Sequence, residues 1–334
     1  MEKWELRQKQ SLPLEVKITM SLRRIDDWYN HWDGNVYVAY SGGKDSTVLL
    51  DLVRQIHPDV EAMFIDTGLE YPEVREMAKE YGAVFAKPTM SFRQVIQKYG
   101  YPVTSKEQAN FICRVRKDPE TMEAFHEWIN TGNVNNPTDI FVKYILGKRK
   151  DGSITKFRVS KKWYPLLDAP FDTSADCCVI MKKLPFKKYE RQTHKHPYLG
   201  TLACESQRRT QNYLKNGCNV FDRKRPLSMP IAFWTENDIL EYIYTKNLKI
   251  ASVYGDIIKM EDGTYTTTGC DRTGCMFCMF GCHLEKEPNR FQKLSQTHPK
   301  IYDYCMKPTD EGGLGIAEVL DFIGVPYQNN KNEF

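Results

Sequence analysis

Residues 35–47 read Asn-Val-Tyr-Val-Ala-Tyr-Ser-Gly-Gly-Lys-Asp-Ser-Thr, and they carry the strongest indication of the fold. The first six residues predict a buried strand, and the apolar positions that follow the stretch predict a helix reaching Ile56. The two adjacent glycines allow the backbone to turn tightly and to approach a ligand closely. Because the amide groups at the start of a helix attract anions, the turn at residues 41–45 is predicted to bind phosphate.

The elements expected around this turn alternate between strands and helices. An amphipathic helix is expected at 15–32, a second strand at 60–66, a helix from Pro72 to Tyr81, and a short strand at 83–86. This order predicts an α/β fold with a mostly parallel, twisted sheet and helices on both faces. Ligands of such sheets bind beyond the carboxyl ends of the strands, where the glycine turn lies.

The 334 residues suffice for one large α/β domain with appendages or for two small domains. We expect an N-terminal helix at 1–34, a phosphate-binding domain at 35–254 with an insertion at 89–165, a cysteine-rich segment at 255–287, and a tail at 288–334 with one or two short helices. No apolar run approaches the about 18 residues of a membrane helix. The chain begins without a signal-peptide core, so we expect a cytoplasmic protein without membrane contact.

The charged residues give a formal net charge of +4, which suits an anionic ligand and does not by itself indicate nucleic-acid binding. A basic run follows residue 181, and it is either a solvated helix face or a site that gathers anions. Its members are Lys182, Lys183, Lys187, Lys188 and Arg191.

The glycine turn carries the residues expected to act on a phosphate. Lys44 is positioned to neutralise phosphate, and Asp45 is expected to cap the helix or to hold Mg²⁺; these two are the expected catalytic residues. The turn is not a Walker A loop, because an aspartate follows Lys44 and Val38 occupies the place of the first glycine. The expected binding residues of the turn are Ser41, Gly42, Gly43, Lys44, Asp45, Ser46 and Thr47.

The ten cysteines are many for a protein in a reducing compartment, where clustered cysteines indicate metal ligands or redox groups before disulfides. Cys275 and Cys278 form a Cys-x-x-Cys pair, which Cys270 and Cys282 extend on either side. This spacing alone permits zinc, an iron–sulfur cluster or a redox dithiol.

The Ser-Gly-Gly-Lys-Asp-Ser turn resembles the PP-loop of ATP pyrophosphatases, which share the adenine nucleotide alpha hydrolase-like fold. Residues 64–73, Phe-Ile-Asp-Thr-Gly-Leu-Glu-Tyr-Pro-Glu, resemble the second-strand signature of one branch, the phosphoadenylyl-sulfate and adenylyl-sulfate reductases. The resemblance implies that the chain binds an adenine nucleotide, either ATP or an adenylyl sulfate. It also implies that Asp66 and Thr67 line the nucleotide pocket.

Two further segments extend this resemblance. Residues 200–209 are similar to the family pattern Gly-x-Arg-x-x-Glu-Ser-x-x-Arg, which implies phosphate or sulfate binding by Glu205, Ser206 and Arg209, although Leu202 stands in place of the first arginine. Residues 176–185 resemble the Cys-Cys segment of adenylyl-sulfate reductases. That likeness implies a 4Fe–4S cluster held by Cys177, Cys178, Cys275 and Cys278. The local alternative is a set of Cys270, Cys275, Cys278 and Cys282.

The reaction stays open at the level of the sequence. Reductase relatives use a cysteine in a C-terminal Glu-Cys-Gly-Leu-His segment, which this chain lacks, and Ser-Gly-Gly-Lys-Asp-Ser is the form seen where ATP itself is cleaved. One hypothesis is a reductase-family enzyme that acts on an adenylyl sulfate. Another is an ATP pyrophosphatase, dependent on Mg²⁺, that adenylylates a substrate such as a nucleic acid for sulfur insertion. A third is a non-catalytic sensor or partner subunit. An electron-donor or sulfur-donor protein is the expected partner.

Overall fold

The structure is a computed structural model, and it describes residues 1–329. The chain forms two compact units, each built from two separate stretches of sequence. Unit 1 comprises residues 1–89 and 182–275, and unit 2 comprises residues 90–181 together with the chain from residue 276 onward. Within the described residues, no helix is long and apolar enough to cross a membrane.

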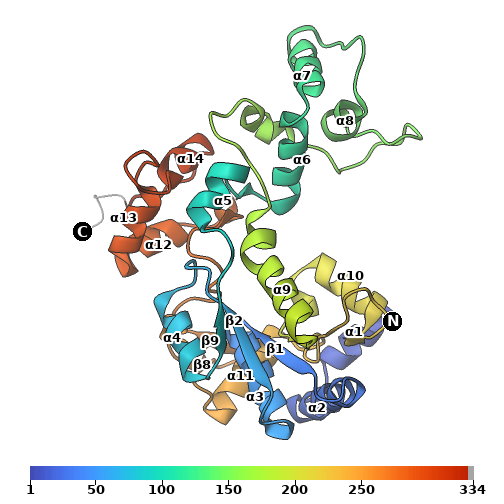
Figure 1. The fold of residues 1–334 in the computed structure, drawn as a ribbon, viewed down its shortest axis with the longest axis vertical. Coiled ribbons are helices and arrows are strands. Elements are labelled where there is room, and N and C mark those ends of the chain that lie inside the picture. Colours follow the sequence, from blue (N-terminus) through green and yellow to red (C-terminus); the bar gives the residue numbers. More distant parts are fainter. Residues whose placement is uncertain (330–334) are drawn as a thin grey trace. The chain divides into compact units, whose positions relative to one another are not determined.

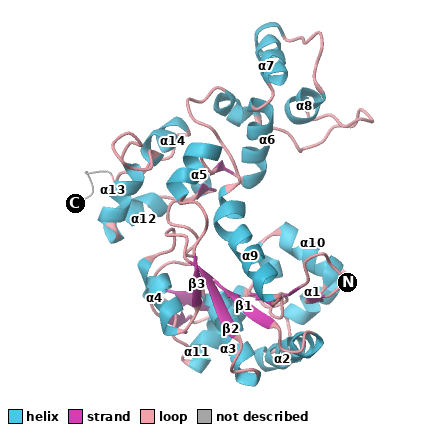
Figure 2. Ribbon diagram, in the orientation of Figure 1, coloured by secondary structure: helices cyan, strands magenta, loops and turns pink. Residues whose placement is uncertain are grey.

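A six-stranded sheet forms the centre of unit 1. Its strands are β1 (Val36–Tyr40), β2 (Glu61–Ile65), β3 (Val84–Ala86), β5 (His196–Leu199), β6 (Asn219–Val220) and β7 (Leu227–Ser228). The strand order is β3-β2-β1-β5-β7-β6, and all neighbours pair in parallel except β6, which runs antiparallel to β7 at one edge. Figure 2 shows β1, β2 and β3 side by side in this sheet. A separate antiparallel pair is formed by β8 (Ile257–Lys259) and β9 (Tyr265–Thr267).

Helices cover both faces of this sheet (Figure 1). The helices of unit 1 are α1 (Lys3–Gln10), α2 (Leu14–His31), α3 (Lys44–Ile56), α4 (Pro72–Glu80), α9 (Leu184–Thr193), α10 (Gln207–Asn216) and α11 (Glu236–Lys246). Side chains alternate between the two faces along a strand. Val38 and Tyr40 therefore join the main core with residues of α2, α3 and α11, whereas Tyr37 and Met63 pack against Phe186 of α9 on the opposite face.

Local signals explain where the two helices nearest the glycine turn begin. Gly43 precedes α3 in an extended conformation, so the turn leads directly into the exposed amide groups of the first helical residues. Thr235 caps α11, because its hydroxyl accepts a hydrogen bond from the amide of Asp238 at 3.2 Å. This cap places Glu236 at the first position of α11.

Unit 2 consists mainly of helices. They are α5 (Phe92–Tyr99), α6 (Lys106–Arg116), α7 (Pro119–Thr131), α8 (Asp139–Phe141), α12 (Arg290–Thr297), α13 (Pro299–Met306) and α14 (Ile316–Phe322). Two short strands, β4 (Val103–Thr104) and β10 (Met279–Phe280), pair in parallel. This pairing joins the two stretches of unit 2, which are far apart in the sequence.

The predicted α/β class with a mostly parallel sheet is confirmed. The tail differs from expectation, because it contains α12, α13 and α14 instead of one or two helices. Pro299 begins α13 almost directly after α12 ends, since proline suits the first turn of a helix and cannot continue an earlier one. The predicted domain boundaries stay predictions; in the structure, unit 2 combines most of the 89–165 insertion with the tail.

Candidate functional site

The glycine turn at the end of β1 requires glycine at position 42. Gly42 has a φ of +69°, and a Cβ atom there would lie 2.6 Å from Cγ1 and 2.8 Å from the carbonyl oxygen of Val74. No real Cβ atom tolerates such distances from a backbone oxygen, so a side chain at this position would displace α4. The turn thus brings the backbone close to α4 without room for a side chain.

Hydroxyl groups hold the turn closed. The Ser41 amide donates to Ser46 Oγ at 3.2 Å, the two serine hydroxyls lie 3.0 Å apart, and Ser46 Oγ donates to the Gly43 carbonyl at 2.8 Å. Thr47 Oγ1 donates to the same carbonyl at 3.1 Å and lies 3.1 Å from the Tyr40 hydroxyl. Thr47 is therefore engaged inside the turn, whereas Ser41 lies at its exposed side.

Lys44 is buried, with only 5% of its surface exposed, although it carries a charge. Its ammonium group donates to Glu236 Oε1 at 2.6 Å and to the Asp271 carbonyl at 2.9 Å. The amide of Lys44 donates to the Tyr254 hydroxyl at 3.4 Å. The ammonium thus has a carboxylate partner that an incoming phosphate would have to share or displace.

Asp45 is a partly buried acid next to this lysine. Burial raises the pKa of its carboxyl above the ordinary value, and the positive charges of Lys44 and Arg272 oppose that rise. Its Oδ1 atom is buried without a hydrogen-bond partner. A buried polar atom left unpaired costs free energy, and this cost is common at sites that bind ligands or ions. The orphaned oxygen is compatible with the predicted role of Asp45 toward Mg²⁺ or a ligand.

The end of β2 carries the second group of predicted binding residues. Asp66 is paired with Arg75, whose guanidinium nitrogens lie 3.0 and 2.9 Å from Asp66 Oδ2. The amide and hydroxyl of Thr67 both donate to the Glu70 carboxylate, at 3.1 and 2.8 Å. Lys182 lies 3.4 Å from the same carboxylate. Asp66 and Thr67 follow β2, which is the direct neighbour of β1, and their place in a nucleotide pocket stays a prediction.

The segment at 200–209 packs directly against the glycine turn. A Cβ atom on Gly200 would lie 3.0 Å from Ser46 Cα, so the two backbones are in close contact. Ser206 caps α10 by accepting from the Arg209 amide at 3.3 Å. Glu205, whose side chain is 9% exposed, forms an ion pair with Arg209 and a second one, at 2.8 Å, with Arg272.

Arg272 is a residue of this site that the sequence analysis missed. It lies between Cys270 and Cys275, where the cysteine spacing drew attention and the arginine carried no local signal. Its guanidinium and that of Arg209 both act on Asp45, so the structure brings these charges together beside the start of α3. One region of unit 1 therefore contains the turn at 41–47 together with Glu205, Ser206 and Arg209.

The predicted cluster cysteines are divided between the two units. Cys275 lies at the end of unit 1, and Cys177, Cys178 and Cys278 lie in unit 2. The Sγ atoms of Cys177 and Cys178 are 4.0 Å apart. Burial raises the pKa of Cys278, and the neighbouring Cys178 acts in the same direction. Cys178 and Cys278, which belong to the two separate cysteine groups of the sequence, therefore lie in the same unit.

The alternative ligand set is Cys270, Cys275, Cys278 and Cys282, and two of its members, Cys278 and Cys282, interact electrostatically. Burial raises the pKa of Cys282 to about 12, and Cys278 contributes to that rise. Its thiol donates to the Met279 carbonyl at 3.0 Å. Across residues 1–329, no group of three or more histidine, cysteine or acidic side chains is arranged to hold a metal ion.

A comparison with known protein families identifies the chain. A family model described as the phosphoadenosine phosphosulfate reductase domain matches residues 35–279, which include the PP-loop, the segment at 200–209 and the Cys-x-x-Cys pair. The chain belongs to this family. The reductase family predicted from the sequence is thereby confirmed, and the chain is a nucleotide-dependent, reductase-like enzyme of sulfur metabolism.

Two relatives, both named adenosine 5'-phosphosulfate reductase, agree with the match. The adenosine 5'-phosphosulfate reductase of Geobacillus sp. (strain WCH70) is 26% identical over 64% of this chain and 91% of its own length. The enzyme of the same name from Geobacillus kaustophilus is 27% identical over 65% of this chain and 92% of its own length. One solved structure is also similar, the crystal structure of phosphoadenylyl-sulfate reductase from Candida auris in complex with phosphate. The matched region spans 79% of the present chain and 98% of the Candida auris chain, with 14% identity and a TM-score of 0.37.

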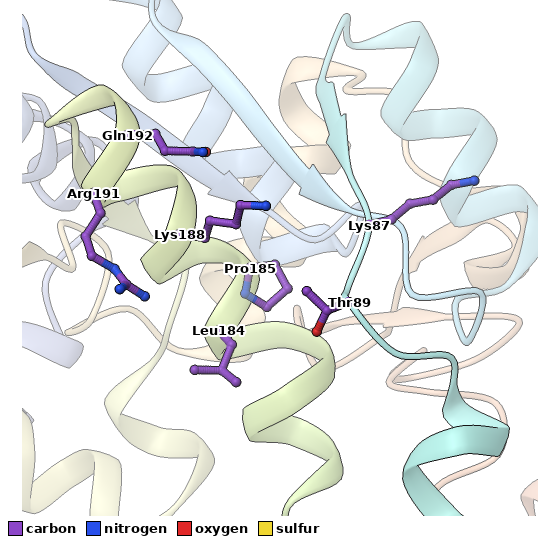
Figure 3. Close-up of a pocket in the computed structure, with 7 residues that line it drawn as sticks. All are labelled: Lys87, Thr89, Leu184, Pro185, Lys188, Arg191 and Gln192. Atoms are coloured by element: carbon purple, nitrogen blue, oxygen red, sulfur yellow. The ribbon is translucent and has the colours of Figure 1, made fainter.

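Unit 1 of this family member also contains a cavity of about 410 Å³ between the end of β3 and α9 (Figure 3). Lys188 extends from α9 toward the segment after β3, which carries Lys87 and Thr89. None of the predicted nucleotide-binding residues lines this cavity. Part of the basic run therefore faces a hollow in the surface. The lining residues are Lys87, Thr89, Leu184, Pro185, Lys188, Arg191 and Gln192.

Proposed function

We propose that the chain binds an adenylyl sulfate at the PP-loop of unit 1 and cleaves it reductively to AMP and sulfite. The observation that carries this proposal is the gathering of Lys44, Arg209 and Arg272 around the start of α3. Amide groups at a helix start and guanidinium groups bind phosphate and sulfate oxygens well. Two relatives named adenosine 5'-phosphosulfate reductase support the same class of substrate.

The reaction needs two electrons from outside the chain. A thiolate of a donor dithiol attacks the sulfate sulfur, the bond from that sulfur to the bridging oxygen breaks, and AMP leaves with the oxygen. The first donor sulfur now carries the sulfonate group. The second thiol of the donor attacks this first donor sulfur, which releases sulfite and leaves the donor as a disulfide. Lys44 stabilises the negative charge that develops on the departing phosphate. A dithiol protein is accordingly the proposed partner.

The attacking thiol is assigned to the donor because the cysteine among residues 288–329 is inaccessible. Cys305 is the only cysteine after Cys282, and it is fully buried in unit 2. Burial raises the pKa of its thiol well above the ordinary value, which opposes formation of the reactive thiolate. A donor thiol that reaches the nucleotide from solvent avoids this difficulty.

The 4Fe–4S cluster and its ligands Cys177, Cys178, Cys275 and Cys278 form a second part of the proposal. Cys177, Cys178 and Cys278 lie in the same unit although the two cysteine groups are distant in sequence, which supports a common site. Thiolate ligation of iron would require these cysteines to lose their protons on binding, which a cluster favours strongly. We assign the cluster no chemical step.

The test is an anaerobic incubation of the purified chain with adenylyl sulfate and dithiothreitol, and in parallel with ATP and Mg²⁺. The proposal expects AMP and sulfite from adenylyl sulfate and no pyrophosphate from ATP. Lys44→Ala is expected to abolish the reaction, whereas Lys246→Ala, on α11, is expected to keep it. Pyrophosphate release from ATP would instead establish the ATP pyrophosphatase hypothesis. Binding without any turnover would establish a sensor or partner subunit.

A further inference from the structure

One carboxylate in unit 1 holds two guanidinium groups. Glu205 forms ion pairs with both Arg209 and Arg272, and their side chains are 45% and 54% exposed, respectively. One negative charge cannot neutralise two positive ones, so a positive charge remains on the exposed side of this triad. Each guanidinium has five N–H donors, of which the shared carboxylate takes only a part. The triad therefore keeps donors for an anionic group from solvent.

The triad lies beside the phosphate-binding turn. Gly200 contacts Ser46 at the start of α3, and Glu205 follows five residues later in the same segment. The charges of Arg209 and Arg272 both act on the buried carboxyl of Asp45. An anion held by the triad would thus be a direct neighbour of an anion held by the amide groups of α3.

Arg272 is held in place by the residues on both sides of it. The carbonyl of Asp271 accepts a hydrogen bond from the Lys44 ammonium at 2.9 Å. Thr273 Oγ1 lies 3.1 Å from the hydroxyl of Tyr254, which in turn accepts from the Lys44 amide at 3.4 Å. The backbone around Arg272 is therefore attached twice to the PP-loop, so its guanidinium is positioned before a ligand arrives.

Arg272 takes the place of an arginine that the family pattern has and this chain lacks. The family pattern has an arginine where this chain has Leu202, and Leu202 is 1% exposed in the main core of unit 1. An apolar side chain in the core contributes nothing to anion binding. Arg272 supplies a second guanidinium from another segment, opposite the same glutamate.

We propose that Arg272, together with Arg209, binds the sulfate group of an adenylyl sulfate, while the PP-loop binds the α-phosphate. This inference rests on the proposed function. AMP lacks the sulfate and therefore does not engage the pair. Arg272 is accordingly a specificity-determining residue, which separates the sulfated nucleotide from the product AMP.

The experiment measures binding of adenylyl sulfate and of AMP by isothermal titration calorimetry, without a reductant. Arg272→Ala is expected to weaken binding of adenylyl sulfate about ten- to a hundred-fold, which is typical for loss of hydrogen bonds to a charged group. Its affinity for AMP is expected to equal that of the wild type, which also shows that the PP-loop is intact. Arg208→Ala is the matched control, because Arg208 is exposed on α10 next to Arg209, and it is expected to change neither affinity.

Three different results would overturn the inference, and they have different meanings. A wild-type protein that binds adenylyl sulfate no better than AMP would contradict the proposed function and the inference together. A wild-type protein that prefers adenylyl sulfate, with an Arg272→Ala variant that keeps the preference, would contradict the inference alone. An equal loss of both affinities in Arg272→Ala would show that Arg272 supports the fold of the PP-loop and does not select the sulfate.

Discussion

Lys44 Nζ lies 2.6 Å from Glu236 Oε1, so the buried lysine of the PP-loop is paired with the first residue of α11. The side chain of Glu236 is 44% exposed, whereas that of Lys44 is nearly inaccessible. The Glu236 carboxylate forms an ion pair with the Lys44 ammonium group, which is expected to bind phosphate. Without a ligand, the two residues neutralise each other; with a ligand, the Glu236 carboxylate and the phosphate compete for the Lys44 ammonium group.

Glu236→Gln is expected to bind adenylyl sulfate and AMP more tightly than the wild type, by about three- to tenfold. The substitution removes a negative charge that repels the phosphate, and an interaction of this kind is worth about 1 kcal/mol at a partly exposed site. Calorimetric titration measures the effect. Glu241→Gln, on the same helix, is the control and should leave both affinities unchanged. Weaker binding by Glu236→Gln would mean that the glutamate positions Lys44 for the ligand instead of competing with it.

Asp45→Asn is expected to stabilise the folded protein near neutral pH. Burial raises the pKa of Asp45 in the folded state, so the folded protein holds this proton more tightly than the unfolded chain. The stability that this group contributes is therefore fully present below the ordinary aspartate pKa and is lost as pH rises through the raised value. Asparagine is neutral throughout and avoids that loss.

The gain in stability is expected to shrink as pH falls from about 7 to about 4, because the wild-type carboxyl then takes up its proton. Urea unfolding followed by circular dichroism at each pH measures the difference in the free energy of unfolding. Asp27→Asn is the control, because Asp27 is an exposed residue of α2. A variant that is less stable than the wild type at neutral pH would show that a charged Asp45 is part of the folded state.

The chain is expected to be brown when it is purified without oxygen, with broad absorption near about 400 nm, as thiolate-bound iron–sulfur clusters have. Cys178→Ser and Cys278→Ser should each reduce the iron content and the absorption, because both residues are proposed ligands. Cys113→Ser, in α6 of the same unit, should retain both. Iron analysis and absorption spectra of the anaerobic proteins give the answer.

The same measurement separates the two ligand sets. Loss of iron in Cys177→Ser with retention in Cys270→Ser and Cys282→Ser supports the pairing of the two cysteine groups. The reverse pattern supports the local set. Zinc in place of iron under anaerobic conditions would rule out the proposed cluster.

Lys17→Met is expected to lower the free energy of unfolding by about 3–5 kcal/mol. The Lys17 ammonium is buried and lies 2.7 Å from Asp238 Oδ2, so its removal leaves a buried carboxylate without its cation. Asp238 also belongs to the cap of α11, which carries Glu236 beside the PP-loop. Lys17→Met/Asp238→Asn should recover part of the loss, and Lys3→Met, an exposed change in α1, should have no effect. Urea unfolding measures all three, and a loss below about 1 kcal/mol would place the pair among weak surface interactions.

Elements with local signals can be read from the sequence alone. The apolar run that ends at Tyr40, followed by two glycines, determines a buried strand and a helix start, because β1 and α3 depend on neighbouring residues. The cap at Thr235 could be predicted for the same reason. The predicted PP-loop residues are accordingly found together at the end of β1.

Which charges meet at that loop depends on the folded arrangement of distant segments. Glu236 is 192 residues from Lys44, and Arg272 is 67 residues from Glu205, so no pattern of neighbouring residues relates them. Their pairing follows from the order of the strands and from the packing of α11 and the segment after β9 against α3. The second guanidinium and the carboxylate that occupies Lys44 could not be predicted for this reason: an ion pair depends on distance in space, which distant segments acquire only when the sheet and its helices assemble.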